Sequence, residues 1–280
     1  MTQETAQEIL RLNRETYEKI APVFDKTRKT LWDEFNIFEP YVKEGMRILD
    51  IGCGNGRLYR FLKDRGIEYT GIDQNEYLIN QARERYPSAT FVRGDILELH
   101  KISEISGHVF DAVFCISLLS NIPSRQYRRY VLSSMRQFVR GTGVLCMINW
   151  NLWRPGWKQK NIWTGFTHRL FWPADLWGIR YKVSERKLGF CDVMAWWGNA
   201  YSGSPLYYRA FTTSELIMLC RQVGFHDVES FYVNRGKSAN WWNGRNIVTI
   251  AQMTPRAVRV HAPFSVTVPA PAAVMSARTL

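Results

Sequence analysis

A glycine-rich segment that begins at Asp50 carries the clearest chemical signal in the sequence. Residues 50–56 are Asp-Ile-Gly-Cys-Gly-Asn-Gly, between a short apolar run and a segment with helical spacing. Glycine lets the chain turn sharply from strand to helix and lets a ligand approach the backbone closely. Position 57 holds Arg57, where the dinucleotide fingerprint G-x-G-x-x-G would need another glycine. The pattern therefore favours a nucleotide-like ligand that lacks phosphates.

Two more carboxylates follow the next two apolar runs. Asp73 lies 23 residues after Asp50, and an acid at such a strand end can accept hydrogen bonds from both hydroxyls of a ribose. Asp95 ends the following run and could accept a hydrogen bond from an exocyclic adenine amine. Any one of these aspartates alone would be interpreted as a turn or helix-cap residue. Three of them in order, at successive strand ends, predict one ligand crevice.

Alternating strands and helices are expected to position these residues. Continuous apolar runs are typical of the strands of a parallel sheet that is buried on both faces. Helical spacing separates these runs. Strands are expected at 48–51, 68–73, 89–95, 108–117 and 143–150, and helices at 58–66, 75–87 and 124–139.

The flanking segments differ in composition from this alternation. Residues 1–43 predict two N-terminal helices, with an interruption at Pro22. The main domain is expected at 44–253, with an insertion at about 150–204 that is rich in Trp, Gly, Lys and Arg. After it we expect a helix at 213–223, a strand at 227–233, a polar loop and a last strand at 246–253. Residues 254–280 predict a disordered tail, with an added strand at 264–268 as the alternative.

The overall composition excludes several classes of protein. The 280 residues are 46% hydrophobic and 22% charged, which indicates a folded globular chain. No apolar stretch reaches the roughly 18 residues of a membrane span, and the N-terminus is polar, so a cytoplasmic protein is expected. The five cysteines are scattered and form no CxxC pair, which predicts buried thiols and no metal site. The net charge of +12 suggests a polyanionic partner.

Four motifs in this order resemble the class I S-adenosylmethionine-dependent methyltransferases: DIGCGNG, GIDQN, GDI and FDAVFCIS. The resemblance extends over about residues 10–253. It implies an α/β fold with a doubly wound, seven-stranded, mostly parallel, Rossmann-like sheet whose last strand is antiparallel. It also implies S-adenosyl-L-methionine as the cofactor. The residues implied to bind it are Asp50, Gly52, Cys53, Gly54, Asn55, Gly56, Asp73, Gln74, Asp95, Ile96, Cys115 and Ser117.

Further stretches resemble the tRNA wobble-uridine carboxymethyl methyltransferases, which esterify a 5-carboxymethyl group on uridine 34. They are YEKIAPVFDKTRKTLW (17–32), CDVMAWW (191–197), PLYYRAFTTSEL (205–216) and the closing RNIVTIAQ. The sequence departs from that family at two places. Leu206 and Arg209 flank the Tyr-Tyr pair where Arg and His are usual, and Ser120-Asn121 replaces a common His-His pair.

The acceptor that this resemblance implies needs little catalytic chemistry. A carboxylate is already ionised at neutral pH, so its methylation requires a cation to position it and no general base. Arg28 and Arg209 are the candidate cations, and Tyr208 is a candidate hydrogen-bond donor or stacking surface. None of the five histidines lies in a motif that suggests deprotonation.

The insertion leaves the substrate class open at this point. Between Trp150 and Phe190, eight Lys or Arg residues accompany two acids, a pattern suited to unstacked bases and phosphates. The tryptophans could equally pack the insertion onto the sheet, or form a lid over a small or lipophilic acceptor. A non-catalytic cofactor-binding subunit is a third interpretation. We expect tRNA as the partner and no membrane, and a small activating protein subunit is compatible with the sequence.

Overall fold

The computed structural model describes residues 1–154, 188–195 and 206–254 of the chain. Most of the tryptophan-rich insertion and all of the C-terminal tail after residue 254 lie outside these ranges. The predictions of an RNA groove and of a disordered tail therefore stay predictions. No helix in the described ranges is both long and apolar enough to span a bilayer.

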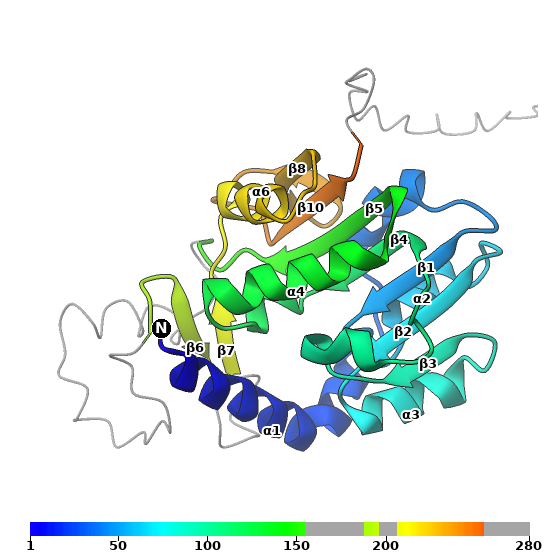
Figure 1. Cartoon of the computed structure of the whole chain (residues 1–280), viewed down its shortest axis with the longest axis horizontal. Coiled ribbons are helices and arrows are strands. Elements are labelled where there is room, and N and C mark those ends of the chain that lie inside the picture. The colour runs from blue at the N-terminus through cyan, green and yellow to red at the C-terminus, as the bar shows by residue number, and fades with distance from the viewer. Residues whose placement is uncertain (155–187, 196–205, 255–280) are drawn as a thin grey trace, which may run out of the picture.

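An eight-stranded sheet forms the centre of the molecule, in the order β3-β2-β1-β4-β5-β10-β8-β9 (Figure 1). Strands β1 to β5 are parallel, and β10 is antiparallel to both β5 and β8. The predicted doubly wound, mostly parallel sheet with an antiparallel last strand is confirmed. The strands are β1 (Arg47–Ile51), β2 (Glu68–Asp73), β3 (Thr90–Arg93), β4 (Phe110–Ile116), β5 (Val139–Trp150), β8 (Asp227–Asn234), β9 (Lys237–Ala239) and β10 (Asn246–Gln252).

The eighth strand, β9, lies in a polar segment for which the sequence predicts a loop. Arg235 and Gly236, with φ of 51° and 71°, reverse the chain so that Lys237 pairs with Asn234. Two consecutive positive φ values are typical of the tight turns that join antiparallel strands. The sheet therefore gains a short edge strand beyond the seven expected.

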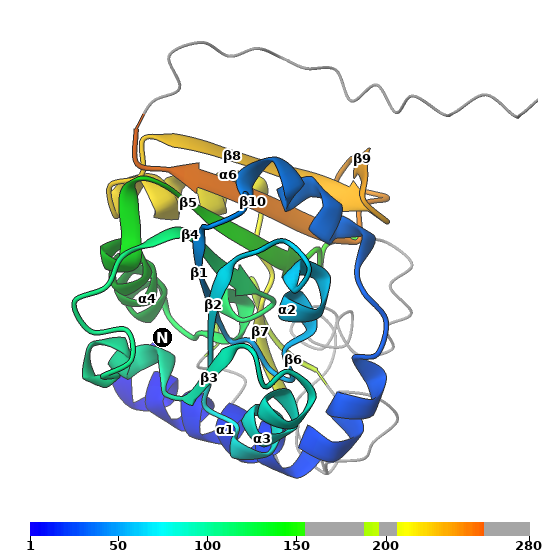
Figure 2. The same cartoon turned by 90° about the vertical axis from the view of Figure 1, so that its right-hand side faces the viewer.

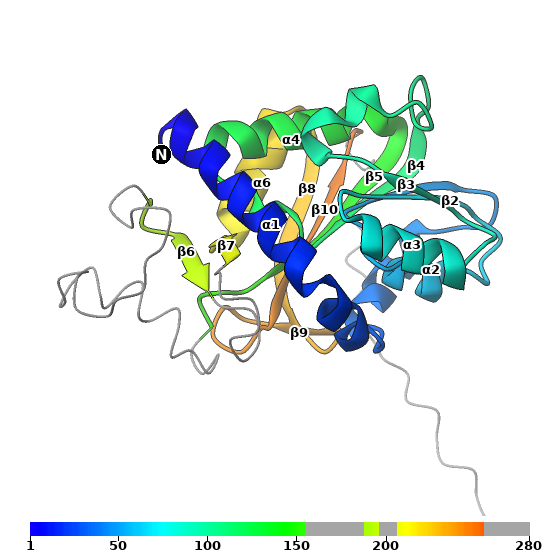
Figure 3. The ribbon, with the colours of Figure 1, turned by 90° about the horizontal axis from the view of Figure 1, so that it is seen from below.

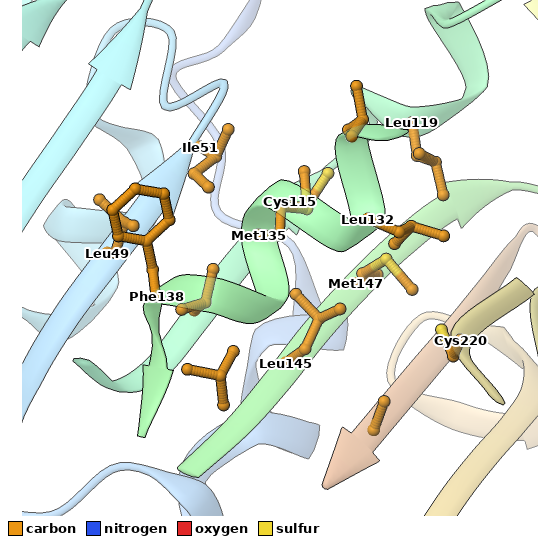
Figure 4. Close-up of a cluster of buried hydrophobic side chains, with 14 of the residues drawn as sticks. Leu49, Ile51, Cys115, Leu119, Leu132, Met135, Phe138, Leu145, Met147 and Cys220 are labelled. Carbon is orange, nitrogen blue, oxygen red and sulfur yellow. The ribbon is translucent and has the colours of Figure 1, made fainter. Parts of the chain in front are cut away.

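Helices cover both faces of the sheet and bury two cores (Figure 2). On one face, α4 (Arg125–Phe138) and α6 (Thr213–Gln222) pack over β4, β5 and β10, and Leu132, Met135 and Cys220 meet Cys115, Leu145 and Met147 there (Figure 4). On the other face, aromatic side chains such as Phe35, Phe38 and Phe114 fill the core. The covering elements are α2 (Arg57–Leu62), α3 (Glu76–Arg85), η2 (Ile96–Lys101), η3 (Leu119–Asn121), α4 (Arg125–Phe138) and α6 (Thr213–Gln222).

The N-terminal region contains two helical elements, α1 (Gln3–Thr27) and the 3-10 helix η1 (Asp33–Tyr41). The expected break at Pro22 is wrong, because α1 runs through this residue. Pro22 removes only the hydrogen bond to the carbonyl of Glu18, and both residues are exposed, so water can satisfy that carbonyl.

Helix α1 crosses the molecule obliquely at the edge where the parallel strands end (Figure 3). Asn13 fixes its first half: its side chain donates to the carbonyl of Asn121 and accepts from the amide of Tyr207 at 2.8 Å. Asp25 fixes its last turn through two 2.6 Å hydrogen bonds from Arg85. Tyr207 belongs to β7 (Leu206–Arg209), which pairs with β6 (Asp192–Ala195) in a separate two-stranded sheet. These contacts hold α1 in place over the carboxyl ends of the parallel strands.

Candidate active site

A cleft opens at the carboxyl ends of the parallel strands, beneath α1. Its lining comes from α1, from the glycine turn after β1 and from the ends of β2, β3 and β4. One part of the cleft, its acidic end, is lined by acids around the glycine turn and the ends of β2 and β3. The adjoining part, near the last turn of α1, is lined by aromatic and cationic side chains, and a Cβ on Gly54 would lie 3.9 Å from Phe24 there.

The glycine turn has the backbone that the sequence predicts. Gly52 and Gly54 have φ of 80° and 55°, a region that disfavours side chains. A Cβ on Gly52 would lie 2.7 Å from Leu118, whereas one on Gly54 would meet only Phe24 at 3.9 Å. Gly54 thus presents bare backbone to the cleft. Gly56 does not line the cleft; it precedes α2 and faces Tyr86, so its predicted ligand contact is not seen.

Asp73 lies beside this turn at the end of β2. Its carboxylate accepts hydrogen bonds from the backbone amides of Gly54 and Asn75, both at 2.9 Å. Burial raises the pKa of Asp73, and these amides partly oppose that change. The carboxylate is thereby held in place at the cleft with lone pairs left for a ligand's hydroxyl groups.

Asp95 and Gln74 both meet an arginine that the sequence analysis did not select. Arg14 of α1 forms an ion pair with Asp95 and a 3.3 Å hydrogen bond with Gln74. The other oxygen of Asp95 caps η2 by accepting from the amide of Leu97. Arg14 therefore links α1 to the ends of β2 and β3. Ile96, next in the chain, also lines the cleft.

Asp50 is the most deeply placed acid of the cleft, with 1% of its surface exposed. One carboxylate oxygen accepts a 2.6 Å hydrogen bond from Tyr69. The other has no partner among the residues that the structure describes. Burial raises the pKa of Asp50 to about 7. A buried acceptor without a partner is costly in a protein interior, so this oxygen fits the cationic amino group of a bound ligand.

The other predicted cofactor residues divide by where their side chains lie. Cys53 and Ser117 line the cleft, and Ser117 accepts a 2.8 Å hydrogen bond from the indole of Trp150. Asn55 also borders the cleft, but its amide donates to Asp25 and so helps to hold α1. Cys115 does not reach the cleft, because its side chain is fully buried in the core. All five cysteines are free thiols and four are buried, as expected.

The adjoining part of the cleft, near the last turn of α1, carries two arginines. Arg28, which caps α1, lies over the ring of Phe24 at 4.1 Å. Arg57, the first residue of α2, lies over Trp32 at 4.2 Å. Burial lowers the pKa of both, and for Arg57 burial and the charge of Arg28 together lower it to about 9. Two cations held this close indicate a site for an anion.

Two tyrosines border the same part of the cleft. The hydroxyls of Tyr17 and Tyr208 are hydrogen-bonded to each other, and Tyr17 donates to Asn121 at 3.3 Å. Burial raises the pKa of Tyr17 to about 12 and that of Tyr208 well above its ordinary value. Both hydroxyls are therefore neutral donors at physiological pH. Asn121 stands where the family that the sequence resembles commonly has histidine, and here it accepts a hydrogen bond from Tyr17.

Arg209 does not belong to this cluster, and its predicted role is corrected. It contacts Asp192 at 3.3 Å and Glu215 at 2.9 Å, and it borders a separate surface pocket beside α4. Side chains alternate across a strand, so Tyr208 faces the cleft and its neighbours face away. Of the three residues predicted to act on the acceptor, Arg28 and Tyr208 line the cleft and Arg209 does not.

Several lining residues escape prediction because they come from α1 and from the ends of distant elements. The residues of α1 have only one sequence signal, an amphipathic helix, in which the polar residues on the inward face resemble ordinary interface residues. In the described ranges, no three His, Cys, Asp or Glu side chains are grouped so as to hold a metal ion. The residues that sequence reasoning did not find are Asn13, Arg14, Tyr17, Trp32, Arg57, Asn121 and Trp150.

Residues 49–145 match the family model described as a methyltransferase domain, which contains the glycine turn, Asp73 and Asp95. The chain is an S-adenosylmethionine-dependent methyltransferase. Its fold is that of known enzymes of this kind. A structure of the CcbJ methyltransferase from Streptomyces caelestis is 16% identical with a TM-score of 0.59, covering 86% of this chain and 98% of that one. An S-adenosylmethionine-dependent methyltransferase from Clostridium acetobutylicum is 14% identical with a TM-score of 0.55, covering 85% and 99%.

Sequence relatives of this methyltransferase carry several substrate names. A methyltransferase of Encephalitozoon cuniculi is 28% identical over 75% of this chain and 84% of its own length. The tRNA (carboxymethyluridine(34)-5-O)-methyltransferase of Saccharomyces cerevisiae is 33% identical over 43% of each chain. The ubiquinone biosynthesis O-methyltransferase of Alkalilimnicola ehrlichii is 35% identical over 29% of this chain and 33% of its own length.

One further solved structure contains a second protein. It is a complex between the Trm112 methyltransferase activator of Haloferax volcanii and a methyltransferase. It is 13% identical to this chain with a TM-score of 0.54, and it covers 87% of this chain and 98% of that one. This likeness concerns the fold.

The acidic end of the cleft fits S-adenosylmethionine. The partnerless oxygen of Asp50 fits the cationic amino group, and Asp73 fits the ribose hydroxyls. The bare backbone at Gly54 allows close approach of the ligand. When bound, the cofactor supplies a methyl group already activated by its sulfonium, so the chain's main tasks are alignment and exclusion of water.

Proposed function

We propose that this methyltransferase esterifies a carboxylate, and that the carboxylate is the 5-carboxymethyl group of a tRNA wobble uridine. The observation that carries the proposal is the cluster of Arg28, Arg57, Tyr17 and Tyr208 in the cleft that also contains the cofactor residues. Two cations beside two neutral tyrosines form a set suited to a carboxylate. A neutral lipophilic acceptor offers no charge for the two arginines to bind.

The proposed reaction requires binding and orientation from these residues. The acceptor arrives as an anion, since a carboxylic acid has a pKa near 4, and no proton has to be removed from it. Arg28 and Arg57 would bind the carboxylate, and the hydroxyl of Tyr208, turned from Tyr17, would donate a hydrogen bond that fixes its orientation. The raised pKa values of both tyrosines argue against either one acting as a general base near neutral pH.

Transfer RNA as the carrier of the carboxylate rests on separate support. The net charge of +12 favours a polyanion, and a relative from Saccharomyces cerevisiae is named for the carboxymethyluridine reaction. Segment 17–32, on which the sequence resemblance to that family depends, supplies Tyr17, Arg28 and Trp32 to the cleft. A small activating subunit is part of this proposal because a protein of similar fold forms a complex with one.

The test is methylation of tRNA that carries 5-carboxymethyluridine at position 34. The protein would be incubated with S-adenosylmethionine and that tRNA, with and without a Trm112-type subunit, and the nucleosides analysed by mass spectrometry. The proposal predicts formation of the methyl ester, and none on tRNA with an unmodified uridine 34. A matched assay with a quinone precursor tests the small-acceptor alternative suggested by the relative from Alkalilimnicola ehrlichii. Cofactor binding without turnover on either acceptor would favour a non-catalytic subunit.

A further inference from the structure

Two adjacent tryptophans in the loop between β9 and β10 lie on the surface. Trp241 and Trp242 are 54% and 57% exposed, although tryptophan usually buries most of its ring. Their rings form an edge-to-face pair with centroids 5.2 Å apart. An exposed aromatic pair of this size is characteristic of an interaction surface.

Hydrogen bonds hold this loop in one conformation. The side-chain oxygen of Asn240 accepts from the amides of Trp242 and Asn243 at 3.0 and 3.1 Å. The side chain of Asn151, which is fully buried, donates to the carbonyls of Trp241 and Gly244 at 2.8 and 2.9 Å. The tryptophans are therefore presented on a preorganised backbone, which reduces the entropy lost when a ligand stacks on them.

The loop lies at the edge of the sheet where the active-site cleft opens. Asn151 directly follows Trp150, which lines the cleft and binds Ser117. The adjacent turn packs against η1, since a Cβ on Gly236 would lie 2.8 Å from the carbonyl oxygen of Asp33. In Figure 2, β9 likewise lies at the upper side of the view, near η1 and away from α1. A macromolecule whose reactive group enters the cleft would pass this loop.

The charges that the loop itself carries are of one sign, although η1 beside it carries Asp33 and Glu34. Arg235, Lys237 and Arg245 are exposed, and residues 230–246 contain no acid. Aromatic rings flanked by cations match unpaired nucleotides, whose bases stack on the rings and whose phosphates meet the cations. A loop whose own charges are all cationic is a less suitable partner for a small basic or apolar protein surface.

We propose that Trp241 and Trp242, with Arg235, Lys237 and Arg245, form a docking surface for the unpaired nucleotides that adjoin the methyl-accepting nucleotide of an RNA. This inference rests on the proposed function for its choice of RNA. It assigns to the loop between β8 and β10 a role in binding substrate that is separate from the methyl-transfer cleft.

The test compares RNA affinity between variants of the full-length protein. The probe is a fluorescently labelled anticodon stem-loop, with a fully paired hairpin of equal length as its control. The double substitution Trp241→Ala/Trp242→Ala should weaken stem-loop binding by about tenfold or more, because stacking on each ring is lost. Trp241→Phe/Trp242→Phe should retain most of the affinity, since a phenyl ring still stacks. Tyr77→Ala, which removes an exposed ring on α3, should change nothing.

The cations are tested by salt dependence. Substituting Arg235, Lys237 and Arg245 together by Gln should flatten the plot of log affinity against log salt, by up to about 0.7 for each phosphate that the protein no longer neutralises. Calorimetry should give unchanged cofactor affinity for all these variants. Unchanged stem-loop affinity in the double alanine variant would overturn the inference, and loss of binding to a Trm112-type subunit alone would identify a protein partner instead.

The outcomes separate this inference from the proposed function. If carboxymethylated tRNA is esterified normally and the alanine variant binds the stem-loop as tightly as the parent, the proposed docking surface is wrong and the proposed function is supported. If no tRNA is methylated but stem-loop binding still depends on the tryptophans, the proposed docking surface is supported and the proposed methyl acceptor is wrong.

Discussion

The two ends of the cleft are assembled in different ways. The cofactor end comes from a single stretch of the chain, from Asp50 to Asp95, and its acids follow successive parallel strands. The acceptor end combines Arg28 of α1, Arg57 of α2 and Tyr208 of β7. Asn13 and Tyr207, whose hydrogen bond joins α1 to β7, lie 194 positions apart in the chain.

This difference explains why one end can be inferred from sequence and the other cannot. In a parallel sheet, the carboxyl ends of neighbouring strands must meet at one edge, so local motifs are enough to place the cofactor acids. At the acceptor end, the side chains meet only because helix α1 crosses that edge of the sheet. Substitutions that loosen the anchoring of α1 should therefore weaken acceptor binding more than they weaken cofactor binding.

The largest effect is expected at Arg28. In Arg28→Met the cleft loses a cation. We expect kcat/KM for the RNA acceptor to fall by about a hundredfold or more, because the acceptor carboxylate loses a partly buried charged partner. Cofactor affinity should stay within about twofold of the parent, because Arg28 is not among the residues assigned to the cofactor. Steady-state rates and calorimetry on the same preparations would measure both.

Arg28→Lys provides the matched control for that experiment. It keeps the charge but loses the planar fork of the guanidinium, so part of the activity should return. Full activity of Arg28→Met would show that this arginine does not hold the acceptor, while the assignment of the cofactor end would stand.

The second effect concerns Asp73. In Asp73→Ala, S-adenosylmethionine should bind about ten- to a hundredfold more weakly, since a charge-assisted pair of hydrogen bonds to the ribose is lost. Asp64→Ala is the control, because Asp64 is an exposed aspartate that pairs only with Lys63 in the described structure. Equal cofactor affinity in the two variants, measured by calorimetry, would contradict the assignment of the ribose contact.

Sequence reasoning fails at places where non-local packing overrides a local signal. Pro22 normally ends a helix, yet α1 continues because the carbonyl that loses its partner faces water. Polar Lys237–Ala239 gives no strand pattern, yet the turn before it forces pairing with β8. Arg209 attracts attention beside Tyr208 because of its charge, whereas strand alternation directs it to Glu215.

Asp50 provides a third prediction, through the pH dependence of cofactor binding. Its pKa of about 7 in the free protein should fall when a cationic amino group is bound, because an opposite charge favours the ionised carboxylate. Below pH 7, binding therefore releases a proton, and affinity weakens as pH falls from 7 to 6, by at most about tenfold. Calorimetry at pH 6 in two buffers of different ionisation enthalpy would count that proton.

Asp50→Asn is the control for the linkage, since an amide cannot titrate. Its cofactor affinity should be lower but independent of pH between 6 and 8. The same slope in this variant and the parent would assign the proton to another group and remove Asp50 from contact with the amino group.

The smallest effect on catalysis is expected at Arg209, and it separates the two arginines that the sequence treats alike. Arg209→Met should leave kcat, KM and cofactor affinity near the parent values, because the side chain faces Asp192 and Glu215 outside the cleft. Those two carboxylates would lose their shared cation, so the melting temperature should fall by a few degrees. Glu215→Gln should lower it by less, since Arg209 keeps Asp192 as a partner. If Arg209→Met instead reduced turnover as strongly as Arg28→Met while keeping its melting temperature, the acceptor end would have to extend beyond β7 to the face where α4 and α6 meet.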